Sequence, residues 1–113
     1  MPRESMGTYR ITELPADERP RERLAKAGPG ALSKAELLAI LLRVGIPGLN
    51  SVQLGQLILD KLGGLAGIQR ASLEEMCQIH GLGMAKAAQI KAAIELGSRM
   101  AKEQASEDRK SVV

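Results

Sequence analysis

Two glycines bracket one apolar residue between two helical segments, and few arrangements of the chain accommodate that pattern. Gly81, Leu82 and Gly83 follow an amphipathic segment, and an alanine-rich helical pattern begins directly after them. Glycine allows a tight turn and leaves no side chain between the main chain and an approaching molecule. The amides that open the next helix lack intrahelical acceptors and lie at the positive end of the helix dipole. This layout is typical of a helix-hairpin-helix, whose amides bind a phosphate group.

Residues of the hairpin form the predicted DNA-binding site, with the backbone amides as donors and one lysine as the nearby cation. The predicted site residues are Gly81, Leu82, Gly83, Met84, Ala85 and Lys86. We expect a bulky residue at Gly83 to block the phosphate and to strain the turn. An alternative stays open, because the same glycines are compatible with a plain tight connection in which one of them caps a helix.

The composition favours an all-α fold. The chain has 113 residues, no tryptophan, no phenylalanine and a single tyrosine, so its core must be aliphatic. Leucine, alanine and methionine are good helix formers, and alternating runs of valine, isoleucine and threonine are absent. A chain of this length buries a core without disulfides or metals. We therefore predict one compact bundle of about five helices.

Capping residues and glycine stops divide the chain into helices. Pro20 suits the first position of a helix that ends at Gly28. Ser33 and Ser72 each precede a glutamate by three residues, which is the spacing of a capping box. Ser51 is expected to cap a third helix, and residues 65–68 are expected to form a short turn. The predicted helices span residues 20–27, 34–43, 51–62, 72–79 and, from about Met84 to Lys102, a last helix whose core face holds Ala87, Ile90, Ile94 and Ala101.

The predicted organisation is an N-terminal arm over residues 1–18, a helical domain over 19–103 and a flexible polar tail over 104–113. Residues 34–62 repeat the helix-loop-helix layout of residues 72–102, which indicates two hairpins in tandem. The first loop lacks the Gly-x-Gly pattern and contains Pro47, which has no amide hydrogen. We therefore expect the first hairpin to support the structure and the second to bind.

Charge and cysteine content restrict the partners and the compartment. The net charge is only +3 and no segment is a basic arm, so DNA affinity should be weak and independent of base sequence. Cys77 is the only cysteine, which excludes a disulfide within the chain and is compatible with a reducing compartment. No signal peptide is recognisable, and the apolar run over residues 37–42 is too short to cross a bilayer. We expect a cytoplasmic protein with no membrane partner.

Several segments together resemble the N-terminal region of the RadC family, also called UPF0758. These segments are Ile11 to Pro15, Glu18 to Leu24, Leu32-Ser33, Glu36 to Gly45, Gly81-Leu82-Gly83, Lys86-Ala87 and Glu95-Leu96-Gly97. The resemblance covers about residues 10–102. It implies a tandem helix-hairpin-helix fold of the SAM/RuvA-domain-2-like type and an association with DNA repair. It also implies a following metalloprotease-like domain of the JAB/MPN type.

The metalloprotease-like part is not expected within this chain. Its zinc site needs a His-x-His pair with a downstream Asp and a Glu, and His80 is the only histidine present. Catalytic zinc usually takes three protein ligands. We therefore expect no catalytic residue, no metal and no cofactor here, and any such activity would belong to the absent C-terminal domain. His80 is expected to be a partly exposed hairpin residue, and Cys77 a helix filler.

The leading prediction is a non-enzymatic module that holds the DNA backbone through residues 81–86. The alternative is a protein–protein or intramolecular docking domain without nucleic-acid binding, with another protein or the absent C-terminal domain as its partner. Leu82 would then contact that partner. Acidic residues alternate with Arg19, Arg21 and Arg23, so we expect these arginines to form a salt-bridged face or an intramolecular clamp.

Overall fold

The computed structural model describes residues 19–111, and over that range the chain is all-α, with one isolated bridge between Ile46 and Leu49. Six α-helices and one 3-10 turn follow in order: α1 (Pro20–Ala27), η4 (Pro29–Ala31), α2 (Lys34–Leu42), α3 (Ser51–Leu62), α4 (Gly64–Arg70), α5 (Leu73–Cys77) and α6 (Met84–Ser111). The all-α prediction is confirmed. The turn predicted over residues 65–68 is wrong, because a short helix, α4, occupies this segment. The predicted arm over residues 1–18 lies outside the described residues.

The predicted capping boxes are present at the starts of α2 and α5. The Glu36 N–H donates to Ser33 Oγ at 3.1 Å, and the Ser33 N–H donates to Glu36 Oε1 at 2.8 Å. Ser72 and Glu75 exchange the same two bonds at 3.0 and 2.8 Å. Each box satisfies backbone donors that the first turn of a helix leaves without partners. The starts of both helices therefore follow from residues only three positions apart.

The cap of α3 differs from the prediction. Asn50, and not Ser51, is the N-cap: its Oδ1 accepts from the Gln53 N–H at 2.9 Å. Gln53 Oε1 accepts in return from the Asn50 N–H at 2.9 Å. Asparagine and serine are equally good caps, and the reciprocal bond with Gln53 decides between the two neighbours. Ser51 becomes the first residue of the helix, and its hydroxyl is left without a capping role.

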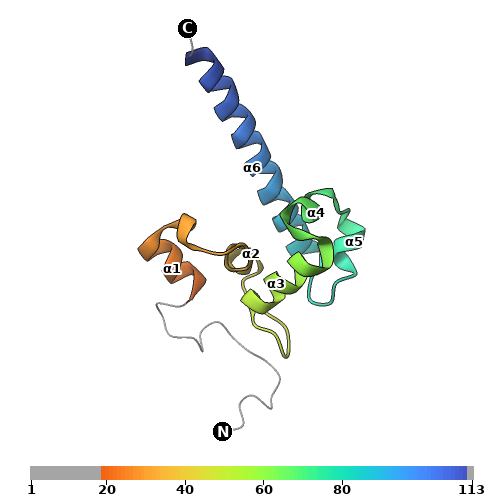
Figure 1. Cartoon of the computed structure of the whole chain (residues 1–113). Helices are drawn as coiled ribbons and strands as arrows, with labels where there is room; N and C mark the ends of the chain where they lie inside the picture. The colour runs from red at the N-terminus through yellow and green to blue at the C-terminus, as the bar shows by residue number, and fades with distance from the viewer. Residues whose placement is uncertain (1–18, 112–113) are drawn as a thin grey trace.

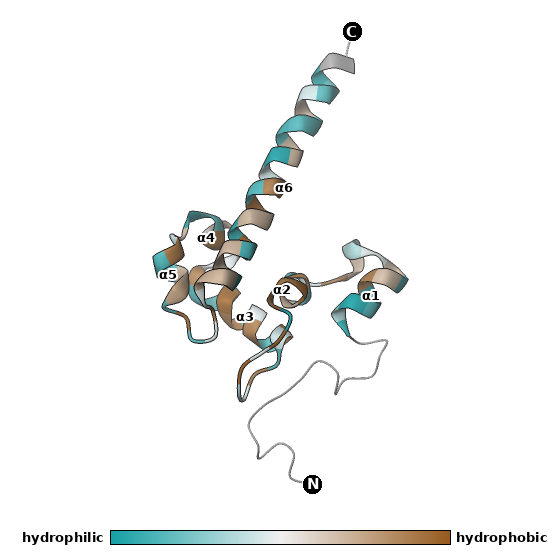
Figure 2. Ribbon diagram, turned by 180° about the vertical axis from the view of Figure 1, so that it is seen from behind, coloured by the Kyte–Doolittle hydropathy of each residue, from teal (hydrophilic) through white to brown (hydrophobic). Residues whose placement is uncertain are grey.

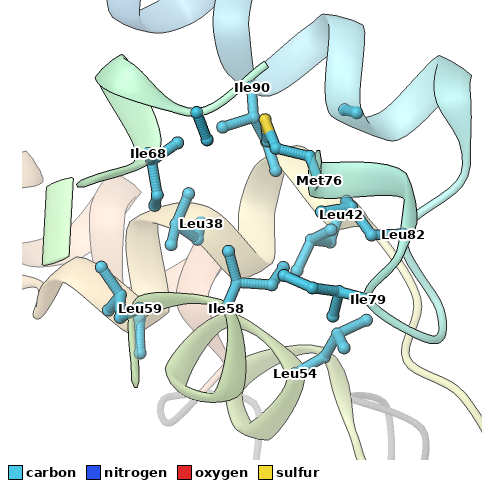
Figure 3. Packing of buried hydrophobic residues seen from close by; sticks show 13 residues of the cluster. Leu38, Leu42, Leu54, Ile58, Leu59, Ile68, Met76, Ile79, Leu82 and Ile90 are labelled. Atoms are coloured by element: carbon cyan, nitrogen blue, oxygen red, sulfur yellow. The ribbon is translucent and has the colours of Figure 1, made fainter. Parts of the chain in front are cut away.

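Five helices contribute to one aliphatic core. Figure 3 shows its side chains converging from α2, α3, α4, α6 and the α5–α6 segment. The largest of its fully buried apolar residues are Leu42, Leu54, Ile58, Ile68, Met76, Leu82 and Ile90. The helix α2 packs against α1, α3 and α6, as expected of a helix that is apolar nearly all round. In Figures 1 and 2, α1 lies on one side of α2, whereas α4 and α5 lie on the other.

The last helix is longer than predicted. It continues to Ser111 instead of ending near Lys102, so residues 104–111 are helical. Pairs four residues apart support its outer part: Arg99 Nε lies 2.9 Å from Glu95 Oε2, and Gln104 Nε2 donates to Asp108 Oδ1 at 3.1 Å. This part extends away from the bundle and is mostly hydrophilic (Figure 2). Ala101 is exposed, so its predicted place on the core face is wrong. The reason is that α6 extends beyond the helices that it packs against.

An arginine clamp joins α1 to the start of α2. Arg23 pairs with Glu36, and its Nη2 donates to the Ala31 carbonyl oxygen at 2.9 Å. The hydrogen bond from the Ser33 N–H, assisted by the Arg23 guanidinium, holds the pKa of Glu36 below its ordinary value of 4.5. The predicted intramolecular clamp is thus confirmed for Arg23.

This clamp leads to a pH-dependent prediction for Glu36→Gln. Glutamine keeps the capping box but removes the charge, so the variant should lose about 1 kcal/mol of stability at pH 7. A lowered pKa in the folded state stabilises the protein above the unfolded-state pKa, and this contribution is lost as pH falls through the folded-state value. The difference in unfolding free energy between wild type and variant should therefore narrow below about pH 4.5, as measured by urea denaturation. Glu75→Gln changes a capping box without an arginine and should cost less. Equal losses in the two variants would contradict the clamp.

Candidate nucleic-acid interface

The connection between α5 and α6 is a tight hairpin loop over residues 78–83. The Leu82 N–H donates to the Ile79 carbonyl oxygen at 3.0 Å, and Gly81 between them has a φ of +94°. The Ala87 N–H then donates to the Gly83 carbonyl oxygen at 2.9 Å, which makes Gly83 the residue that opens α6. The predicted Gly-Leu-Gly segment therefore reverses the chain and leads directly into a long helix.

The two glycines of the hairpin have different roles. A Cβ atom on Gly81 would lie 2.6 Å from Ile46 Cγ2, and the positive φ already disfavours any other residue there. A Cβ atom on Gly83 would have no neighbour within 4 Å, and its backbone is unstrained. The expectation that a side chain at Gly83 strains the turn is therefore wrong. That strain would arise at Gly81, because this glycine packs against the loop of the first hairpin.

Leu82 anchors the hairpin and does not face a partner. Its side chain is only 2% exposed and belongs to the core, as Figure 3 shows. Its N–H is already bonded to the Ile79 carbonyl oxygen. Leu82 therefore holds the loop against the bundle, and the interpretation of its side chain as a surface contact in a docking domain is wrong.

The start of α6 presents donors that the described part of the chain does not use. The amides of Gly83, Met84, Ala85 and Lys86 have no acceptor among residues 19–111, as the first turn of a helix requires. Gly83, Met84 and Ala85 are exposed. The Lys86 Nζ donates to the Val44 carbonyl oxygen at 3.5 Å and has no acidic partner in this range. Geometrically this is a helix N-terminus with one adjacent cation, which suits an anion.

The loop of the first hairpin supports this helix start. Ile46 packs over Gly81, and the Leu49 N–H donates to the Ile46 carbonyl oxygen at 3.0 Å. Pro47 and Gly48, whose φ is +90°, occupy the two central positions as in a type II turn. The loop that holds Pro47 therefore packs against the connection between α5 and α6.

Sequence reasoning missed Arg43, which directly follows α2. Its φ is +73° and its ψ is −48°, and the Val44 N–H donates to the Leu42 carbonyl oxygen at 2.9 Å. This is a γ-turn centred on a residue other than glycine, a conformation that costs about 1–3 kcal/mol. Glycine is the usual residue for a left-handed backbone at a helix end, but the φ of the nearby Gly45 is not positive. No local signal therefore pointed to Arg43.

The comparisons with known proteins place the chain in a family. The family model described as UPF0758 N-terminal matches residues 11–88, which include both hairpins and the start of α6. The chain belongs to the UPF0758 family. The RadC resemblance deduced from the sequence motifs is thereby confirmed.

Relatives in the UPF0758 family are longer than this chain. A UPF0758 protein of Chloroflexus aurantiacus is 56% identical over 97 residues, covering 86% of this chain and 42% of the relative. One of Roseiflexus castenholzii is 57% identical over 91 residues, covering 80% and 39%. One of a Polaromonas species is 48% identical over 97 residues, covering 86% and 43%. The chain thus spans about two fifths of the curated UPF0758 proteins it matches. No solved structure matches it significantly.

Two further residues singled out from the sequence, His80 and Cys77, belong to no metal-binding group in the described part of the chain. His80 is exposed in the hairpin loop, and Cys77 is half-buried against the core. Within residues 19–111 of this UPF0758 chain, no three His, Cys, Asp or Glu side chains form a group that could hold a metal ion. In the same range, no helix is long and apolar enough to cross a membrane.

Proposed function

We propose that this region of the UPF0758 protein is a non-enzymatic module that binds the DNA backbone without reading its sequence. The observation that carries the proposal is the set of unused amides at the start of α6, next to the cation of Lys86. Amides at a helix N-terminus bind phosphate oxygens through hydrogen bonds and the helix dipole. Contacts with phosphates position a protein on DNA but carry no base information.

The affinity should be modest, because one hairpin neutralises few phosphates. Each neutralised phosphate contributes about −0.9 to the slope of log affinity against log salt concentration. We therefore expect weak binding with a shallow salt dependence. A catalytic or metal-dependent activity is assigned to no residue of this region.

Charge reversal at Lys86 tests the proposal. Lys86→Glu should weaken duplex binding and make the salt slope shallower by about 1, because one phosphate contact is lost. The fold should persist, since glutamate in the first turn of a helix suits the dipole. In titrations followed by amide chemical shifts, duplex DNA should perturb residues 83–86 of the wild-type protein most strongly.

Lys102→Glu is the matched control, because it makes the same charge change on the exposed outer part of α6. Its DNA affinity should stay near that of wild type. Gly83→Asp provides a second variant, because aspartate is a good N-cap and its side chain has open space there. It should weaken DNA binding without loss of stability. Equal effects of Lys86→Glu and Lys102→Glu, or no amide shifts at low salt, would argue against the hairpin.

A docking function is the second candidate, and a different surface favours it. Leu96 and Met100 lie four residues apart on α6 beyond the bundle and are 61% and 64% exposed. Residues at this spacing share one face of a helix and suit contact with a protein partner. If duplex DNA leaves all amides unchanged while Leu96→Glu abolishes association with a longer UPF0758 chain, docking would replace DNA binding as the function.

A further inference from the structure

A basic cleft of about 200 Å³ lies between α1, the C-terminal part of α2 and the first residue of α3. Arg19, Arg21 and Arg43 line it together with one acidic residue, Glu22. Three arginines against one glutamate leave this lining with a formal charge of +2. A concave site with such a surplus of positive charge attracts anions.

The side chains of two of these arginines have no hydrogen-bond or ion-pair partner within the described residues. Arg23, on the same helix as Arg21, pairs with Glu36 and donates a hydrogen bond to the Ala31 carbonyl oxygen. Within residues 19–111, by contrast, the guanidinium groups of Arg21 and Arg43 have no hydrogen bond or ion pair, and both residues are exposed. Their guanidinium groups therefore offer free donors to a ligand in the cleft.

The cleft also contains a buried hydroxyl without a partner. Ser51 is only 1% exposed, yet its Oγ makes no hydrogen bond. Asn50 caps α3 in its place, so the Ser51 hydroxyl has no structural use. Buried polar groups in folded proteins are nearly always paired, and an orphan needs an explanation. Ser51 is also the first residue of α3, where the helix dipole favours negative charge.

The strained backbone at Arg43 lies at the lining of the same cleft. A γ-turn around a residue other than glycine persists only where its surroundings impose it, and such strain tends to gather at binding sites. Here the strained residue carries one of the two unengaged guanidinium groups of the cleft. Glycine at this position would adopt the backbone at less cost but would remove the cation.

We propose that this cleft binds a phosphate group. The Arg21 and Arg43 guanidinium groups would donate to its oxygens from α1 and α2, and the Ser51 hydroxyl would donate from the start of α3. Arginine forks recognise phosphate oxygens in pairs, and donors on three different elements suit a tetrahedral anion. The cleft is smaller than the roughly 300 Å³ at which pockets for whole small molecules begin. It therefore takes one charged group.

The phosphate site is separate from the hairpin site, and its proposal does not depend on DNA binding at the hairpin. The two sites share only the end of α2: Arg43 lines the cleft, and the carbonyl oxygen of the next residue, Val44, accepts from Lys86. A phosphodiester of a nucleic acid and a free phosphate carry the same chemistry. The experiment below distinguishes these two sources.

Titration of the isotope-labelled full chain with inorganic phosphate tests the cleft. Phosphate, but not chloride at equal ionic strength, should shift the guanidinium Nε–H signals of Arg21 and Arg43 and the amide signal of Ser51. Arg21→Gln should lower phosphate affinity about tenfold, because a charge-assisted hydrogen bond is lost. Arg70→Gln removes an exposed arginine outside the cleft and should leave that affinity unchanged.

Two further variants separate binding from folding. Arg43→Gly should weaken phosphate binding while keeping the fold, because glycine tolerates the positive φ. Ser51→Ala should weaken binding and, without phosphate, raise the midpoint temperature of unfolding, because it removes an unpaired buried hydroxyl. Unchanged signals at Arg21, Arg43 and Ser51 in phosphate would overturn the proposal, as would equal losses of phosphate affinity in Arg21→Gln and Arg70→Gln.

A titration with duplex DNA then identifies the source. If the natural ligand is a phosphodiester, DNA should shift the Arg21 and Arg43 signals, and inorganic phosphate should compete with DNA and move them to their positions in the phosphate complex. If only inorganic phosphate shifts them, the source is a free phosphate or a phosphomonoester. Both results support the cleft. A failure of the hairpin proposal would appear separately, as unchanged amide signals over residues 83–86.

Discussion

Gly81→Ala is expected to lower the free energy of unfolding by about 2–4 kcal/mol, whereas Gly83→Ala should cost less than about 1 kcal/mol. At position 81 the new methyl group meets Ile46 Cγ2 at 2.6 Å, and the φ of +94° is unfavourable for alanine. At position 83 the methyl group has open space, and the only cost is a weaker N-cap. Urea denaturation followed by far-UV circular dichroism measures both values.

The two variants make the same chemical change at positions only two residues apart, so a difference in stability reports the surroundings of each glycine. Ile46→Ala in the Gly81→Ala background provides a further check, since it removes the side chain that the new methyl group meets. The double variant should then lose less stability than the sum of the losses of Gly81→Ala and Ile46→Ala. Similar losses at positions 81 and 83 would show that the loops of the two hairpins do not pack as described.

Leu82→Ala should cost about 2–5 kcal/mol, the range for truncation of a fully buried leucine. Leu82 is 2% exposed and packs in the core, so its truncation leaves a cavity beneath the hairpin. Leu96→Ala is the matched control, because this leucine on α6 is 61% exposed. Its stability should stay within about 0.5 kcal/mol of wild type. A small loss for Leu82→Ala would mean that its side chain is free for a partner.

The starts of several helices were predictable from short stretches of sequence. The boxes at Ser33 and Ser72 and the first-turn Pro20 needed only residues within one helical turn. The predicted cap of α3, Ser51, was wrong, because Asn50 and Ser51 are both good caps and a bond with Gln53 selects Asn50. The helix α4 was missed because its seven residues include two glycines, which weaken any helical pattern.

The candidate sites were less accessible to prediction than the helices. The Gly-Leu-Gly motif lies in the connection between α5 and α6, but the sequence does not indicate which of its three residues are exposed. The basic cleft was missed completely. Its unengaged groups, Arg21, Arg43 and Ser51, come from three different helices or their ends, and their types alone are ordinary for surface positions.

By itself, the sequence determined the helical class, the aliphatic core, most helix starts and the family. Each of these depends on composition or on residues a few positions apart, where backbone hydrogen bonds and side-chain spacing act locally. Only the tertiary structure decided that a side chain has no room at Gly81 but has room at Gly83, and that the buried Ser51 lines one cleft with Arg43. Those outcomes depend on contacts such as Ile46 with Gly81, between segments far apart in the chain, and packing alone brings such segments together.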